Sequence, residues 1–113
     1  MTGNLAHLTE IDRLIHEPAR LAIVTILYTV ESADFLYLKR ETGLTKGNLS
    51  SHLAKLEESG YVEIEKTYQG KIPLTVCHLT QEGRQAFEAY RQEMQRMFDH
   101  LDDSSRDEEN RSK

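Results

Sequence analysis

The sequence has no run of hydrophobic residues long enough to cross a membrane. The most apolar segment, residues 21–30, is shorter than the roughly 20 residues that a spanning helix needs, and Thr25 and Thr29 interrupt it. The N-terminus has no basic stretch followed by an apolar core, so we expect no signal peptide. Cys77 is the only cysteine, which excludes an internal disulfide and gives no sign of secretion. We therefore expect a cytoplasmic protein without a membrane partner.

Signatures of catalysis and of metal binding are also missing from the sequence. It contains no Gly-rich phosphate loop and no G-x-S-x-G nucleophile elbow. Cys77 and His78 are adjacent, and neighbouring strand residues point to opposite faces, which makes joint chelation awkward. The remaining histidines show no His-x-x-His spacing. We expect no enzymatic activity, no metal site and no cofactor.

The charge balance of the whole chain argues against nucleic-acid binding, but the charges are unevenly distributed. The formal net charge is -5, whereas phosphate contacts normally require clustered Lys and Arg. Residues 99–113 hold six acids and three bases, while residues 45–56 contain Lys46, Lys55 and no acid. One segment is therefore locally positive. Because residues 102–113 contain no apolar residue, we expect them to form an acidic disordered tail.

Two helices are predicted within the first 30 residues. Thr9 is a suitable N-cap for a short helix over residues 9–16. Pro18 suits the first turn of a second helix, where its missing N–H costs nothing. Apolar residues then surround residues 21–30 instead of forming one stripe, which indicates a buried central helix. The β-branched residues there would also fit a strand, but the length and the proline favour a helix.

Residues 34–60 show the pattern of two helices joined by a short turn. Asp34 predicts the start of the first, over residues 35–41. Gly43 favours the left-handed conformation that ends a helix, and Thr45 caps the second helix. Two helices joined by a Gly-containing turn indicate a helix-turn-helix. The residues of the first helix that we expect in the core are Leu36 and Leu38.

The second of these helices has one apolar edge and one small polar face. At 100° per residue Leu49, Leu53 and Leu56 fall together and form the buried edge. The opposite face is small and rich in hydrogen-bonding groups, and a major groove about 12 Å wide admits such a helix. The same face would also fit a helix that is merely solvated. His52, on the shoulder of the leucine edge, is expected to be partly buried and not to read bases. The helix residues predicted to touch DNA are Thr45, Lys46, Asn48, Ser50, Ser51 and Lys55.

Residues 61–79 predict a β-hairpin directly after this helix. The alternation over residues 61–68, a turn at 69–71 and a second strand over 72–79 support it. Pro73 should lie on a free edge or before the ladder begins. A basic tip beside a DNA-binding helix can reach the minor groove or its phosphates, although an ordinary polar hairpin would look the same. The hairpin residues predicted to touch DNA are Lys66, Tyr68, Gln69 and Lys71.

Thr80 predicts the N-cap of a last helix over residues 81–101, whose apolar residues form a single stripe. The stripe could pack on the chain's own first helices. We favour a dimer seam, because a two-fold dimer places two DNA-binding helices one DNA turn apart, about 34–36 Å. The residues expected in this seam are Leu5, Leu8, Ile11, Phe87, Tyr90, Met94, Met97, Phe98 and Leu101.

Several of these segments together resemble a known family. LTKGNLSSHL at residues 44–53 and LEESGYV at 56–62 resemble the second helix and helix exit of MarR-like and ArsR-like winged-helix regulators. Residues 66–75 are similar to the wing of a compact branch of that superfamily, and LTQEGR at 79–84 to its Leu-Thr-x-x-Gly motif. The resemblance covers about residues 15–87. It implies a dimeric transcription factor that binds operator DNA. The Asp-x-Arg wing motif of larger MarR proteins is absent.

The sequence thus predicts a mainly α fold with a small β-hairpin (α+β), a winged helix-turn-helix with a long C-terminal dimerisation helix. We expect one domain over residues 1–101. Its helix-turn-helix spans about 34–60, its wing 61–79 and its last helix 80–101. The expected function is homodimeric, sequence-specific binding of double-stranded DNA to regulate transcription. The helix would enter the major groove and the wing would touch the flanking backbone or minor groove. Two alternatives remain: a protein-interaction module without DNA contact, and a regulator gated by an unidentified small-molecule effector.

Overall fold

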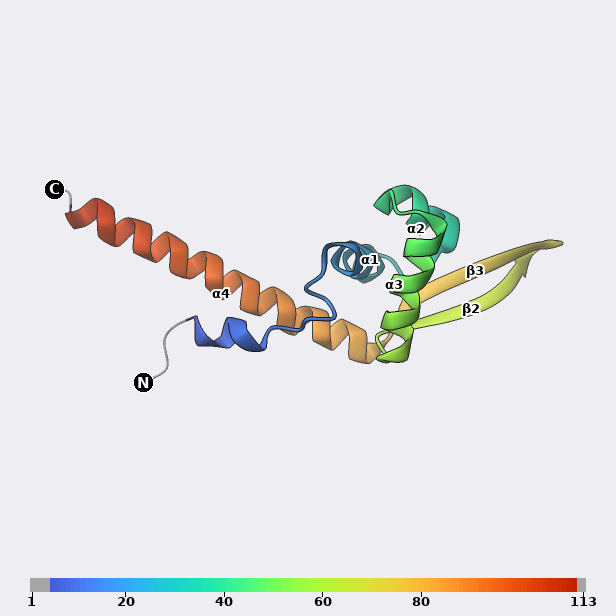
Figure 1. Cartoon of the computed structure of the whole chain (residues 1–113), viewed down its shortest axis with the longest axis horizontal. Coiled ribbons are helices and arrows are strands. Elements are labelled where there is room, and N and C mark those ends of the chain that lie inside the picture. Colours follow the sequence, from blue (N-terminus) through green and yellow to red (C-terminus); the bar gives the residue numbers. More distant parts are fainter. Residues whose placement is uncertain (1–4, 112–113) are drawn as a thin grey trace.

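The computed structural model describes residues 5–111, with side chains as far as residue 105. In Figure 1, α1, α2 and α3 gather at the base of the β2–β3 hairpin, which projects to one side. Helix α4 runs out to the other side, and the molecule measures 70 × 27 × 23 Å. In chain order the elements are a 3-10 helix η1 (Ala6–Glu10), α1 (Pro18–Thr29), β1 (Ala33–Asp34), α2 (Phe35–Thr42), α3 (Lys46–Glu58), β2 (Val62–Gln69), β3 (Ile72–Leu79) and α4 (Gln81–Arg111).

The fold confirms the α+β prediction, with one antiparallel sheet in the strand order β1-β3-β2. Strands β2 and β3 pair from Val62 opposite Leu79 to Gln69 opposite Ile72. The predicted hairpin therefore has nearly the predicted bounds. The short strand β1 was not predicted, because its two residues are too few to show alternation. It pairs with β3 only at Cys77 and Val76.

A tight turn closes the hairpin between Gln69 and Ile72. Gly70 adopts a left-handed φ of 67°, which the first central residue of a two-residue hairpin turn requires. Pro73 lies opposite Tyr68, beyond the part of β3 that pairs with β1. Its missing N–H is tolerated because β3 has only one neighbouring strand there, which confirms the expected free edge.

Helix α1 is the buried helix that the sequence predicts. Glu17 caps it, with its carboxylate accepting a hydrogen bond from the Arg20 N–H at 2.8 Å, and Pro18 occupies the first turn. Ile23, Val24 and Leu27 are fully buried. Other apolar residues of this helix pack more loosely around the same core, namely Leu21, Ile26 and Tyr28.

Helix α2 begins and ends where the sequence predicts, but only one of its two leucines expected in the core is buried. Asp34 accepts a hydrogen bond from the Tyr37 N–H at 2.9 Å, and Gly43 ends the helix with a φ of 70°. Leu38 is fully buried as expected, whereas Leu36 is 69% exposed. The prediction for Leu36 was wrong because residues two apart on a helix differ by 200°, so only one of them can face the core.

The predicted helix over residues 9–16 is also wrong. Helix η1 ends at Glu10, and the Thr9 hydroxyl donates to the Ala6 carbonyl at 2.8 Å instead of capping a helix. A turn follows in which the Asp12 carboxylate accepts from the N–H groups of Leu14 and Ile15. An Asp side chain that bonds nearby backbone offers the chain an alternative to helix. Ile15 is nevertheless fully buried.

Helix α4 is longer than predicted. It continues through Arg111, where the sequence indicated an end at Leu101 and disorder over residues 102–113. No glycine or proline follows Gly83, so nothing in the local sequence stops the backbone even where no apolar face remains. Residues 112–113 lie outside the described residues. None of the helices in the described part of the chain, α4 included, is apolar enough over a sufficient length to span a membrane.

Candidate nucleic-acid interface

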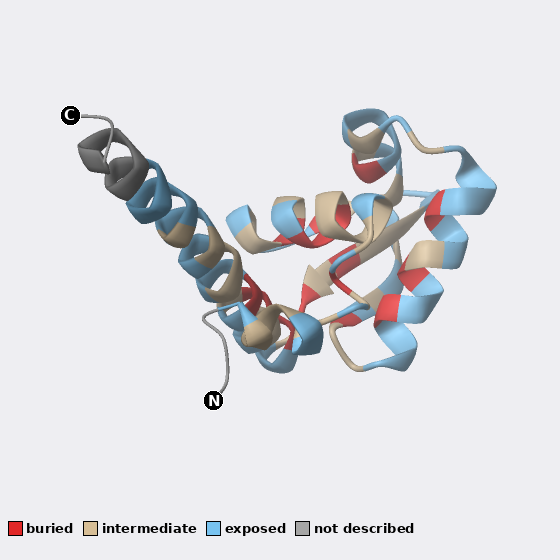
Figure 2. Cartoon of the chain, turned by 60° about the vertical axis from the view of Figure 1, so that its left-hand side comes forward, coloured by how far each residue is buried: buried red, intermediate tan, exposed pale blue. Residues whose placement is uncertain are grey.

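Helix α3 is held to the body by its leucine edge. Leu49, Leu53 and Leu56 are buried, and the Thr45 hydroxyl caps the helix by accepting from the Asn48 N–H at 3.1 Å. The opposite side is exposed over its whole length. Figure 2 shows the buried residues of this helix facing the body and the exposed residues facing outward. The exposed residues at the centre of this face are Gly47, Ser51 and Ala54.

All ten residues predicted to contact DNA lie at the surface, but they do not form one cluster. Lys46 and Ser50 lie on the side of α3 that faces the wing, together with Lys66 of β2. On the helical wheel, Asn48 and Lys55 fall on the other shoulder of α3, where His52 also lies. The other exposed residues of the set lie at the N-cap of α3, at the centre of its outer face and at the wing tip: Thr45, Ser51, Tyr68, Gln69 and Lys71.

A groove of about 290 Å³ separates α3 from the wing. Its basic rim comes from Lys46 and Lys66, and Glu57 also lines it. Two elements therefore present positive charge on either side of one concave surface. The other residues of the lining are Phe35, Ser50, Leu53, Ala54, Ile64 and Thr75.

The wing separates its charges by strand face. Lys66 and Tyr68 alternate with Glu63 and Glu65, so the two pairs point to opposite faces of the hairpin. Lys66 lines the groove beside α3, which places the two glutamates on the far face. Glu63 is also paired with His78 at 2.8 Å. The acidic residues of the wing therefore do not oppose a phosphate backbone that approaches from the α3 side.

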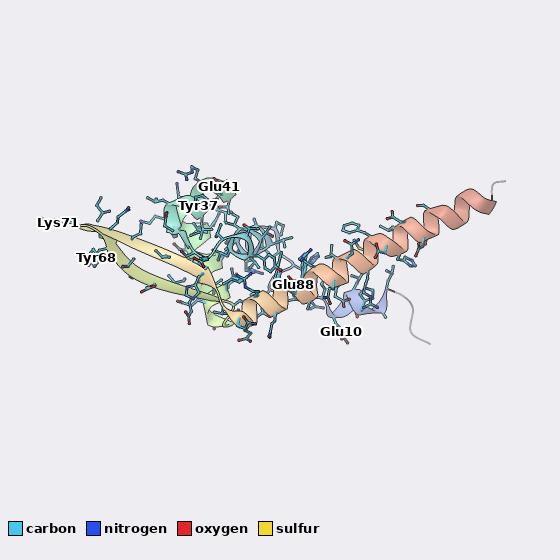
Figure 3. The ribbon with its side chains drawn as sticks, turned by 180° about the vertical axis from the view of Figure 1, so that it is seen from behind. Glu10, Tyr37, Glu41, Tyr68, Lys71 and Glu88 are labelled. Atoms are coloured by element: carbon cyan, nitrogen blue, oxygen red, sulfur yellow. The ribbon has the colours of Figure 1, made fainter. Side chains whose placement is uncertain are left out.

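The end of the hairpin is the most distant part of this surface. Figure 3 shows Tyr68 and Lys71 at that end, away from the helical body. Ile72 is also exposed there, and the sequence did not single it out. The tip therefore combines a cation with large apolar side chains that nothing in the described chain covers.

Comparison with known proteins now identifies this architecture. Residues 19–98 match the family described as winged helix DNA-binding domain. The chain belongs to this family. It is 40% identical over 79 residues to the uncharacterized protein MJ0432 of Methanocaldococcus jannaschii, a match that covers 69% of this chain and 85% of that protein.

Solved structures support the same assignment. A transcriptional regulator homologue from Pyrococcus horikoshii OT3 has a TM-score of 0.79 and 31% identity, covering 84% of this chain and 96% of that one. A MarR-family regulator from Enterococcus faecalis V583 has a TM-score of 0.66, with 98% and 96% coverage; at 20% identity it shows the fold alone. The chain is thus a winged-helix DNA-binding regulator of transcription, and its fold is similar to that of a MarR-family regulator.

The winged-helix surface also includes cations of α2 that the sequence reasoning missed. Lys39 lines a second groove, of about 350 Å³, together with Lys46. Arg40 is exposed, with its guanidinium carbon 5.6 Å from the centre of the Tyr37 ring. In helix-turn-helix proteins the first helix crosses the DNA backbone. The adjacent Lys39 and Arg40 in the last turn of a predicted helix were the signal available in the sequence.

His52 of the winged helix is partly buried, as predicted. Its Nδ1 lies 3.2 Å from Nη1 of Arg20 and 3.6 Å from the Glu17 carboxylate. Burial raises the pKa of Glu17, but hydrogen bonds from the N–H groups of Arg20 and Ala19, together with the electrostatic effect of the nearby His52 and Arg20 side chains, outweigh it. The Glu17 pKa is therefore lowered. Neither Arg20 nor Glu17 was predicted to approach α3.

Cys77 and His78 lie in separate environments. Cys77 is fully buried, and burial, reinforced by the nearby Glu57 and Asp34 carboxylates, raises its thiol pKa to about 11. The thiol therefore stays protonated at neutral pH and is a poor nucleophile or metal ligand. Among the side chains that the structure describes, no three metal-ligating residues form a cluster.

The apolar stripe of α4 divides into two parts. Phe87 and Tyr90 lie in the chain's own core, so assigning them to a dimer seam was wrong. Phe87 packs on Tyr28 with ring centres 4.9 Å apart, and the Tyr90 hydroxyl lies 2.8 Å from His16 Nδ1. Ile11 and Met94 pack partly against the same core. The remaining seam residues are exposed or half-buried: Leu5, Leu8, Met97, Phe98 and Leu101.

Proposed function

We propose that this winged-helix regulator binds a pseudo-palindromic DNA site as a homodimer. Helix α3 would enter the major groove, and the wing would contact the adjoining backbone or minor groove. One observation carries the proposal: three buried leucines fix α3 so that its small polar face points outward beside the lysine-rimmed groove. Small residues such as Gly47 and Ser51 let the helix backbone approach base edges.

The contacts we assign within α3 follow from the chemistry of each side chain. Asn48 can form two hydrogen bonds to adenine, whereas Lys46 and Lys55 suit guanine or phosphate. The first turn of α3 has free N–H groups and the positive end of the helix dipole, which favour a nearby phosphate. Asn48→Ala should therefore change sequence preference more than overall affinity.

Lys71 and Lys55 should make phosphate contacts. Replacing both by alanine is expected to weaken binding to all DNA sequences and to reduce the log–log salt slope by about 1 per lost contact. Fluorescence anisotropy at several salt concentrations measures that slope. Arg91→Ala combined with Arg96→Ala is the matched control, because both are exposed cations of α4, where no DNA contact is proposed. An unchanged slope in the double variant would remove both lysines from the interface.

The dimer part of the proposal rests on the outer half of α4. This helix has 31 residues, roughly 46 Å at 1.5 Å per residue, and its far end extends beyond the body. Phe98 and Leu101 are 50% and 53% exposed there. A second copy would cover them and would join two weakly basic DNA-binding surfaces at high effective concentration.

Phe98→Glu combined with Leu101→Glu should convert the dimer to a monomer. Two unpaired carboxylates in an apolar seam cost several kcal/mol, so the dimer Kd should rise at least about 100-fold. Light scattering during gel filtration measures the mass in solution. Gln95→Glu adds an acid at an exposed position of the same helix outside the stripe and should leave the mass unchanged. A dimer that persists in the double variant would place the seam elsewhere.

Selection of genomic DNA fragments by the purified protein tests the function directly. We expect enrichment of fragments that share an inverted repeat, with half-sites one DNA turn apart. Titration of a selected duplex at low salt then gives its affinity. A folded protein that ignores duplex DNA even in dilute buffer would instead favour the protein-interaction alternative.

A small-molecule effector has less support. The fold also occurs in NadR, solved in complex with 4-hydroxyphenylacetate, with a TM-score of 0.62 and 20% identity. In this chain a cleft of about 430 Å³ lies between η1 and α4, and Glu10, Asp12 and Glu93 line it. Three carboxylates disfavour a carboxylate ligand. The proposed function therefore does not include a small-molecule effector.

A further inference from the structure

A short irregular segment, residues 11–17, connects α4 to α3 through a continuous set of hydrogen bonds. We call this segment the strap. On the α4 side, His16 Nδ1 lies 2.8 Å from the Tyr90 hydroxyl. At the exit of α3, the Tyr61 hydroxyl donates to the Asp12 carboxylate at 2.7 Å. Figure 1 shows the N-terminal segment running beside α4 before it reaches α1.

Arg20 links the strap to the middle of α3. Its Nε donates to the Leu14 carbonyl at 2.6 Å, and its Nη1 lies 3.2 Å from His52 Nδ1. The Glu17 carboxylate lies beside both side chains, 3.8 Å from Arg20 Nη1 and 3.6 Å from His52 Nδ1. The Arg20 side chain is only 12% exposed. The guanidinium therefore forms its hydrogen bonds with groups of the protein itself.

The geometry of the Arg20 contact is directional. A guanidinium only donates hydrogen bonds, so the Arg20–His52 hydrogen bond forms in the tautomer of His52 whose Nδ1 carries no proton. The leucine edge of α3 gives strong but non-directional attachment, and such contacts allow a helix to rotate slightly about its axis. A bonded side chain on one shoulder opposes that rotation. His52 lies on the same shoulder as Asn48 and Lys55, four residues after one and three before the other.

We infer that Arg20 is a positioning residue, which fixes the orientation of α3 relative to α4 through Leu14 and His52. The inference rests on the proposed function, because α4 carries the proposed dimer seam. In a dimer the angle between α4 and α3 sets the distance between the two copies of α3. Arg20 therefore controls whether both helices engage two half-sites at once, and contributes little to binding of one half-site.

The test compares two duplexes taken from the selected DNA, one with two half-sites and one with a single half-site. Arg20→Met keeps most of the aliphatic stem and removes the hydrogen bonds. Its affinity for the two-half-site duplex should fall about tenfold, the usual size of a coupling effect. Its affinity for the single half-site, and the salt slope on that duplex, should stay within about twofold of the wild-type values. Arg13→Met removes an equal charge from an exposed position of the strap and should change neither affinity.

Substitutions at His52 test the same link from the other side. His52→Asn keeps an acceptor near the position of Nδ1 and should bind both duplexes almost like the wild type. His52→Leu removes the acceptor and should behave like Arg20→Met. Circular dichroism checks that each variant is folded, and the His52 pair decides the outcome if Arg20→Met does not fold.

Three results would overturn the inference. If Arg20→Met lowers the affinity for both duplexes equally, Arg20 contributes only to the stability of the fold. A smaller salt slope on the single half-site would mean that Arg20 itself touches phosphate. Unchanged binding in Arg20→Met and His52→Leu would mean that the link does not orient α3. A wild-type protein that is monomeric, or that binds no duplex, would instead refute the proposed function, which is a separate outcome.

Discussion

Ser51→Glu is expected to weaken DNA binding by at least about 100-fold, since like charges forced together at an interface cost several kcal/mol. Ser51 lies at the centre of the exposed face of α3, opposite the leucine edge. A glutamate there would meet the negatively charged DNA at the closest approach of the helix. It would also lengthen the side chain where small residues allow the backbone to approach. Anisotropy titration of a selected duplex measures the loss.

The fold should survive this substitution, because Ser51 is exposed and glutamate forms helix at least as well as serine. Ser104→Glu is the matched control: it makes the same change at an exposed position of α4, 23 residues or roughly 35 Å along that helix from its first residue. It should leave DNA affinity within about twofold, as expected for a distant and screened surface charge. A Ser51→Glu protein that binds as well as the control would mean that this face does not enter the groove. The proposed function would then fail at its central step.

Helix α3 could be predicted because its signals are local. Thr45, Gly43 and Gly60 mark its ends within a few residues of the helix itself. The spacing of its leucines specifies the buried side without any knowledge of what lies against it. The hairpin was predictable for the same reason, since alternation and a Gly-containing turn are both short-range patterns.

The missed features depend on partners far away in the chain. Arg20 and His52 are 32 residues apart, and no local pattern indicates that they meet. Strand β1 exists only because β3 lies beside it. The two-residue strand and the charged cluster are therefore products of tertiary packing, which propensity and periodicity do not encode.

The α4 stripe shows a second reason why the sequence does not predict the whole structure. Its apolar residues are spaced alike from Phe87 to Leu101, so the sequence predicts one continuous surface. The body of the protein ends part-way along the helix, which buries Phe87 and leaves Phe98 exposed. Where a stripe changes from core to surface depends on the length of the other elements. Only the structure supplies that length.

Gly83→Ala should strongly destabilise the protein. A Cβ at Gly83 would lie 2.2 Å from the Tyr61 carbonyl oxygen and 2.9 Å from Leu79 Cδ1. The Tyr61 carbonyl cannot easily move, because it accepts the hydrogen bond from the Thr80 N–H at 3.0 Å. We expect a loss of about 3 kcal/mol, the upper range for overpacking, against a gain of at most about 1 from helix propensity. For a domain of this size a net loss of about 2 kcal/mol lowers Tm by roughly 10 °C.

This effect would explain physically why Leu-Thr-x-x-Gly opens α4. The Thr80 hydroxyl donates to the Gly60 carbonyl at 2.6 Å and accepts from the Gly83 N–H at 3.0 Å. It thereby joins the end of α3 to the start of α4, and glycine at position 83 permits the close approach that these bonds need. Gly47→Ala is the control, because Gly47 is also helical but has nothing within 4 Å of a built Cβ. That variant should match or exceed wild-type stability by up to about 1 kcal/mol. Equal Tm values for the two alanine variants in a thermal melt would show that α3 and α4 do not approach this closely in solution.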